Sequence, residues 1–197
     1  MSRRGCSRLA ACLAAVLAVC AASAPHAEAM PGRAEDSAGG LWLDVPFIQQ
    51  KKEGCGAAAL AMVMRYWSEK DGRTPPASAD ADTIYRALHS REAKGIVAAQ
   101  LARYAEQAGY RAIAFGGEWQ DLRQHLAKGR PLIAALQPGR GDPLHYLVVV
   151  GIEGGDGAVL VNDPAGRKLE RMARARFEQQ WRGTKNWTLL ALPPATP

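Results

Sequence analysis

Residues 49–60 read QQKKEGCGAAAL, with one cysteine between two glycines and two glutamines upstream. The alanines and the leucine that follow Cys55 favour a helix, so we expect Cys55 to open that helix. At a helix N-terminus, the backbone N–H groups and the helix dipole stabilise a thiolate. Gly54 and Gly56 leave room for a substrate backbone to approach, although the same glycines also suit a tight turn. The stretch therefore predicts that Cys55 is a nucleophile.

The N-terminal 29 residues have the pattern of a secretory signal peptide. Three arginines precede an apolar stretch over residues 9–22, and residues 27–29, AEA, fit a cleavage site between small residues. This predicts a periplasmic or secreted protein. Two alternatives keep the chain at a membrane: the apolar stretch stays uncleaved as an anchor, or Cys20 in the sequence LAVC carries a lipid. The apolar stretch is short for a membrane span.

Cleavage of residues 1–29 would leave one thiol in the protein. Three of the four cysteines lie in that segment, so only Cys55 remains and no internal disulfide can form. A single cysteine in an exported protein is either a reactive thiol or part of an intermolecular bridge. A buried, inert cysteine is the alternative.

Composition predicts one globular domain without a nucleic-acid partner. The chain has 197 residues, 48% apolar and 22% charged, which is ordinary for a globular protein. Removing residues 1–29 takes away three of 25 basic and one of 19 acidic residues, so the net charge falls from +6 to +4. The basic residues are dispersed except around residues 167–176, which does not favour a nucleic-acid site.

Hydrophobic periodicity predicts an α+β fold in which N-terminal helices pack on an antiparallel β-sheet. Residues 30–40 lack periodicity and are expected to be a disordered lead-in to a single domain over residues 41–193. An alternating pattern predicts a strand or extended arm at 41–48. The expected helices are residues 55–67, 96–108, 118–128 and 173–181, and the first of them carries an apolar stripe. A further short helix, capped by Asp80 or Asp82, is expected to end at Leu88. The expected strands are 110–115, 131–136, 144–152, 158–163, 168–172 and 187–192.

His145 is the best candidate for a general base. It opens the most apolar strand of the chain, where a buried imidazole needs a polar partner. His26 lies in the signal peptide, while His89 and His125 lie on polar helical stretches and are expected to be solvated. A core histidine that bonds a backbone carbonyl is the alternative for His145.

Asp163 is the candidate that would orient His145. It ends the strand that should pair with the His145 strand, and a turn near residues 153–157 brings both ends to one edge of the hairpin. A carboxylate there fixes the imidazole tautomer and stabilises the imidazolium. Asn162 should face the other side of the strand. The alternative is that Asp163 and Pro164 only mark a turn.

A glutamine upstream of Cys55 supplies the expected oxyanion donor. Gln49 stands six residues before Cys55, and its side-chain amide could donate to the oxyanion together with the Cys55 backbone N–H. Gln50 is the neighbouring alternative. Because successive side chains of an extended arm point in opposite directions, only one of the two can serve.

Four blocks of sequence resemble the bacteriocin-processing, double-glycine cysteine peptidase family. They are residues 45–50 (VPFIQQ), 55–62 (CGAAALAM), 145–149 (HYLVV) and 161–164 (VNDP). The resemblance implies a papain-like fold with Cys55, His145 and Asp163 as the catalytic triad and Gln49 at the oxyanion. It covers roughly residues 42–192. One departure is Cys-Gly-Ala at residues 55–57, where the family commonly has Cys-Gly-Pro or Cys-Gly-Leu.

The resemblance implies a cysteine peptidase that acts on a peptide or protein, without a metal or organic cofactor. Cutting after Gly-Gly in a leader peptide is the specificity that the family suggests. Many members are domains of export ATPases, which implies an association with an export system, but here we expect a stand-alone domain. Exporter peptidase domains face the cytoplasm, and the export signal of this chain conflicts with a leader-peptide substrate. Two alternatives stay open: a non-catalytic peptide-binding module, and a cell-wall peptide amidase or transferase on the same scaffold.

Overall fold

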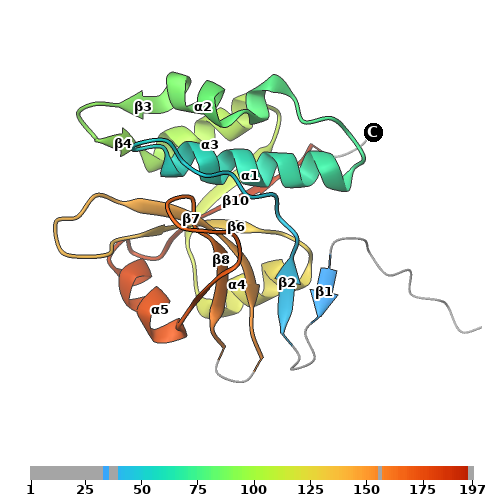
Figure 1. Ribbon diagram of the computed structural model, residues 1–197, viewed down its shortest axis with the longest axis vertical. Coiled ribbons are helices and arrows are strands. Elements are labelled where there is room, and N and C mark those ends of the chain that lie inside the picture. The colour runs from blue at the N-terminus through green and yellow to red at the C-terminus, as the bar shows by residue number, and fades with distance from the viewer. Residues whose placement is uncertain (1–32, 36–39, 155–156, 195–197) are drawn as a thin grey trace, which may run out of the picture.

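The computed structural model describes residues 33–35, 40–154 and 157–194. The predicted signal peptide, residues 1–29, and the alternative lipid site at Cys20 lie outside the described residues. Helices form one layer and an antiparallel sheet forms the other, with two further helices against the opposite side of the sheet (Figure 1). The predicted α+β class is therefore confirmed.

The helices agree with the predicted positions to within a few residues. In the part of the chain that is described they are α1 (Cys55–Lys70), α2 (Ala81–Leu88), α3 (Ala98–Gln107), α4 (Trp119–Ala127) and α5 (Arg174–Arg182), with a 3-10 turn η1 (Ala77–Ala79). Asp80 caps α2, since its side chain accepts a hydrogen bond from the Thr83 backbone N–H. Of the two predicted caps, Asp80 is therefore the correct one.

The strands pair antiparallel throughout the described residues. The main sheet has the order β1-β2-β7-β6-β10-β5, with β8 beside β7 and β9 beside β8, while β3 and β4 form a separate hairpin. The bounds are β1 (Arg33–Glu35), β2 (Leu41–Leu43), β3 (His89–Ser90), β4 (Gly95–Ile96), β5 (Arg111–Gly116), β6 (Leu132–Leu136), β7 (His145–Ile152), β8 (Val159–Asn162), β9 (Glu170–Met172) and β10 (Trp187–Leu192).

Two segments differ from the sequence-based expectation. Within the lead-in that was expected to be disordered, Arg33–Glu35 pairs with Leu41–Leu43. The expected strand at 41–48 ends at Leu43, and an extended arm continues to the turn before α1.

The close contact of β2 with β7 depends on Gly151, because a Cβ at this position would lie 2.6 Å from the Leu41 carbonyl oxygen.

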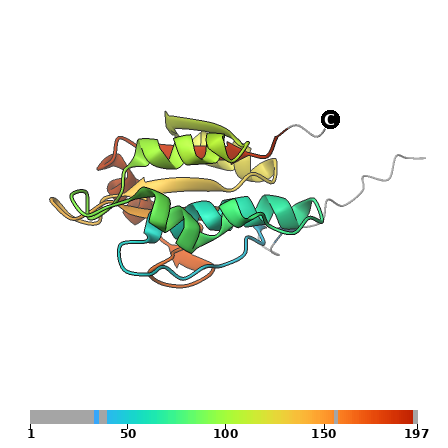
Figure 2. The same cartoon turned by 90° about the horizontal axis from the view of Figure 1, so that it is seen from above.

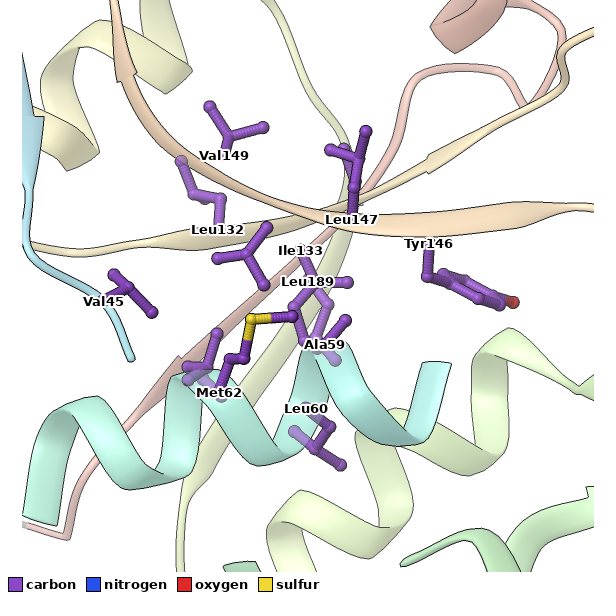
Figure 3. Packing of buried hydrophobic residues seen from close by; sticks show 14 of the residues in the cluster. Val45, Ala59, Leu60, Met62, Leu132, Ile133, Tyr146, Leu147, Val149 and Leu189 are labelled. Carbon is purple, nitrogen blue, oxygen red and sulfur yellow. The ribbon is translucent and has the colours of Figure 1, made fainter. Parts of the chain in front are cut away.

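Residues 55–64 of helix α1 are all buried, whereas an apolar stripe on one side was expected. Figure 3 shows Ala59 and Met62 on the side of α1 that faces Ile133 and Leu189, while Leu60 points away from the sheet. The outer side of α1 is covered by α2 and α3, which lie beside it in Figures 1 and 2. A helical segment that is apolar all round, like residues 55–64, is typical of such a central position.

The sheet has apolar residues on both faces. In Figure 3, Leu132, Leu147 and Val149 lie on the face away from α1, and these three side chains are fully buried. The other face receives α1, while α4 and α5 contact the face away from it. This two-sided burial explains why β7 consists of continuous apolar residues and not of alternating ones.

Candidate active site

Cys55 is the first residue of α1. A tight turn precedes it, in which the Gly54 N–H donates to the Lys51 carbonyl at 2.9 Å, and the helix begins with the Ala58 N–H donating to the Gly54 carbonyl at 3.0 Å. A Cβ at position 54 would lie 3.0 Å from the Lys51 carbonyl oxygen, so this turn favours glycine. Cys55 is buried, with 9% of the residue exposed. The predicted position of Cys55 at a helix N-terminus is therefore confirmed.

His145 and Asp163 lie together at one edge of the sheet, as the hairpin pairing predicted. His145 opens β7, Asp163 follows β8, and Val148 pairs with Asn162 between the two strands. The His145 Nε2–H donates to Asp163 Oδ1 at 2.7 Å. The Ala165 backbone N–H donates to the same oxygen at 2.8 Å, which fixes the carboxylate.

The thiol of Cys55 faces the start of β7. Its Sγ lies 4.0 Å from the carbonyl oxygen of Leu144, the residue that precedes His145. Cys55 is also close enough to His145 to raise the pKa of the imidazole. Because Nε2 bonds Asp163, Nδ1 is the nitrogen left for the thiol. The structure thus brings together the three residues predicted as a triad, and their catalytic roles stay predictions.

The electrostatics of the site favour a charged imidazole and a charged carboxylate. Burial alone lowers the pKa of His145, but hydrogen bonds to Asp163 and Cys55, together with their charges, outweigh it and raise the pKa to about 9. Burial would raise the pKa of Asp163, but the hydrogen bond and charge of His145 and two backbone N–H groups lower it. His145 is therefore protonated at neutral pH.

The two glutamines occupy different environments. Gln49, which the spacing selected, is exposed, whereas Gln50 is half-buried and its backbone N–H donates to the Pro164 carbonyl beside Asp163. Both border a pocket of about 210 Å³ between the arm, α1 and the start of α2, and neither Cys55 nor His145 lines this pocket. Gln50 is thus the less exposed of the two glutamines and bonds the residue that follows Asp163.

The other two described histidines differ from the expectation of solvated side chains. His89 donates from Nε2 to Glu53 Oε2 at 2.8 Å and stacks on Tyr85. His125 is half-buried, and burial lowers its pKa. The sequence did not reveal the Glu53 contact because the two residues are far apart along the chain.

The side chain of Asn162, which was expected on the other side of the strand, bonds backbone groups outside the triad. Its side-chain amide donates to the Val45 carbonyl at 3.0 Å and accepts from the Leu169 N–H at 3.0 Å.

Among the described residues, no group of three or more histidine, cysteine or acidic side chains gathers at one point where a metal ion could bind. No helix in the described part of the chain has the length and apolarity to span a membrane.

The geometry is that of a papain-like cysteine peptidase domain, and comparison with sequence families agrees. The sequence model of the Peptidase_C39 like family matches residues 42–189. The chain therefore belongs to the Peptidase_C39 like family, and the predicted resemblance to double-glycine cysteine peptidases is confirmed. A search of curated protein sequences found no match.

Solved structures support the same fold. A protein of Bacillus anthracis described as a C39-like peptidase aligns with a TM-score of 0.61 and 18% identity, over 78% of this chain and 96% of that chain. The peptidase domain of Streptococcus ComA, a bifunctional ABC transporter involved in quorum sensing, aligns with a TM-score of 0.56 and 20% identity, over 76% and 98%. A double-glycine-motif protease from an AMS/PCAT transporter, solved with a leader peptide, aligns with a TM-score of 0.52 and 22% identity, over 76% and 92%.

Proposed function

We propose that the protein is a cysteine peptidase in which Cys55, His145 and Asp163 hydrolyse a peptide bond. The observation that carries this proposal is the 2.7 Å hydrogen bond between His145 and Asp163, on an imidazole whose pKa is also raised by the Cys55 thiol at the start of α1. An imidazolium beside a thiolate is the charge state that a cysteine nucleophile needs.

The reaction proceeds through a thioester. The Cys55 thiolate attacks the peptide carbonyl carbon, the C–N bond breaks, and His145 gives its proton to the leaving amine. Water then attacks the thioester carbon while His145 accepts the proton of the water. The C–S bond breaks, the acid product leaves, and the thiolate and imidazolium are restored. Asp163 holds the imidazole in the tautomer that both steps require.

The oxyanion of the tetrahedral intermediate is held by the Cys55 backbone N–H and a glutamine amide. The six-residue spacing selects Gln49, whereas burial favours Gln50, and we favour Gln50. Loss of one oxyanion donor lowers kcat by about 100- to 1000-fold. We therefore expect Gln50→Ala to show this loss and Gln49→Ala to retain activity within a few-fold. The reverse order would return the role to Gln49.

Thiol reactivity tests the proposal without a known substrate. We expect Cys55 to react with iodoacetamide faster than a free cysteine at pH 7, and His145→Ala to remove the advantage. His125→Ala is the matched control, because this histidine lies on α4, away from the triad. A wild-type rate no faster than that of the free amino acid, with peptide binding kept in Cys55→Ala, would identify a binding module instead.

The substrate is proposed to be a peptide or protein, with cleavage after Gly-Gly as the first specificity to test. Support comes from the family and from the leader peptide in the complex of the double-glycine-motif protease. Cleavage of peptides with Gly-Gly, Ala-Ala or Leu-Leu before the scissile bond, followed by mass spectrometry, distinguishes this specificity. Cleavage of cell-wall peptides in the same assay would favour the amidase alternative.

Export to the periplasm or the medium is also proposed, on the signal-peptide pattern of residues 1–29. Fractionation of cells that express the full chain and a form without residues 1–29 tests it. We expect the full chain to appear outside the cytoplasm with a mass that corresponds to cleavage after Ala29. Retention of both forms in the cytoplasm would contradict export.

A further inference from the structure

Glu53 has a backbone conformation that an ordinary side chain rarely adopts. Its φ is +59°, in the left-handed region, although it carries a Cβ. This residue lies two positions before Cys55, inside the turn that directs the chain into α1. The orientation of the Cys55 backbone N–H and side chain therefore depends on Glu53 staying in this conformation.

The side chain of Glu53 is held by His89. The two groups meet at 2.8 Å, and their side chains are 32% and 16% exposed, so this contact is largely shielded from water. The imidazole is itself fixed, because it stacks on the ring of Tyr85 with 4.5 Å between the ring centroids. We name this contact the Glu53–His89 pair.

The hairpin that carries His89 also contacts the strand of the general base. His89 in β3 pairs with Ile96 in β4, and the Ile96 carbonyl accepts a hydrogen bond from the Tyr146 hydroxyl at 3.1 Å. Tyr146 follows His145 in β7. The same two-stranded hairpin is thus connected to the turn before Cys55 and to the strand that begins with His145.

We propose that Glu53 and His89 are positioning residues for the nucleophile. The Glu53–His89 pair keeps Glu53 in the left-handed conformation and so fixes Cys55 against His145. This inference rests on the proposed function of Cys55 as a nucleophile. Neither Glu53 nor His89 touches the reacting atoms, so both act through the backbone of the turn.

Substitutions at position 53 separate the backbone role from a general loss of structure. For a residue with a Cβ, the left-handed conformation is less populated by a factor of about 5 to 30, whereas glycine adopts it freely. We expect Glu53→Ala and His89→Ala to slow iodoacetamide alkylation of Cys55 by about 5- to 30-fold. Glu53→Gly should stay near the wild-type rate, and the double variant Glu53→Gly/His89→Ala should recover it.

The control is Asp82→Ala. Asp82 lies in α2 and forms an exposed ion pair with Lys51, which belongs to the same turn as Glu53. This substitution should leave the alkylation rate unchanged. Equal rates for wild type, Glu53→Ala and His89→Ala would overturn the inference, as would a slow Glu53→Gly. The comparison of Ala with Gly at position 53 stays decisive even if His89→Ala fails to fold. The wild-type rate relative to free cysteine tests the proposed function separately.

Discussion

The charge of His145 makes the stability of the protein depend on pH. Its pKa rises from the ordinary 6.5 to about 9 in the folded protein, so the folded state binds the proton more tightly than the unfolded state. The stabilisation is complete below pH 6.5 and is lost as the pH rises through about 9. Asp163, with a lowered pKa, has the opposite sign: its contribution is complete above about pH 3.8 and is lost in acid.

Urea unfolding between pH 5.5 and 9.5 measures this dependence. We expect the contribution of His145 to the free energy of unfolding to fall across this range as its proton is lost. His145→Gln, which cannot titrate, should show a smaller fall. Parallel curves for the two proteins would contradict the assignment of a raised pKa to His145.

Helix α2 provides a test at the scale of a single element. Asp80 accepts from the Thr83 N–H at 2.9 Å and so satisfies one of the free donors at the helix start. Asp80→Ala should lower the free energy of unfolding by about 1 kcal/mol. Asp82→Ala, in the first turn of α2 without a cap bond, should change it by less than about 0.5 kcal/mol. Chemical denaturation of both variants provides the comparison, and equal values would contradict the cap.

The β3–β4 hairpin shows which elements local patterns miss. Each of its strands has two residues, too few for a period-2 pattern to be recognised. The hairpin is held by contacts between residues that are distant in sequence: His89 bonds Glu53, and the Tyr146 hydroxyl bonds the Ile96 carbonyl. Elements of this kind depend on the tertiary structure that surrounds them, and β1 beside β2 is a second example.

At the scale of the whole molecule, α1 joins the helical layer to the sheet. Met62 is fully buried where α1 meets the sheet, and the Trp67 indole N–H donates to the Ala191 carbonyl of β10 at 2.8 Å. Met62→Ala would leave a cavity between the layers and should lower the free energy of unfolding by about 2–5 kcal/mol.

The surface residue Ile113, 37% exposed on β5, gives the matched control for Met62. Ile113→Ala should change the free energy of unfolding by about 0.5 kcal/mol or less. Circular dichroism and tryptophan fluorescence should report one common midpoint for each variant, because both layers share one core. Separate midpoints for helices and sheet would show that α1 does not couple them.

The sequence by itself determined the local features of the site. Cys55 at a helix start follows from glycine and alanine propensities, and the strand-end positions of His145 and Asp163 follow from apolar runs and a turn. Their meeting followed as well, since a hairpin brings the ends of neighbouring strands together. These are short-range properties, carried by residues within a few positions or within one hairpin.

Only the tertiary structure decided the rest. The burial of residues 55–64 of α1 on the side away from the sheet depends on α2 and α3, which no pattern within α1 reveals. The contrast between Gln49 and Gln50 depends on the packing of the arm against Pro164, and the Glu53–His89 pair joins residues 36 positions apart. Such contacts arise because distant segments share one core, and their partners are set by three-dimensional packing and not by local propensity.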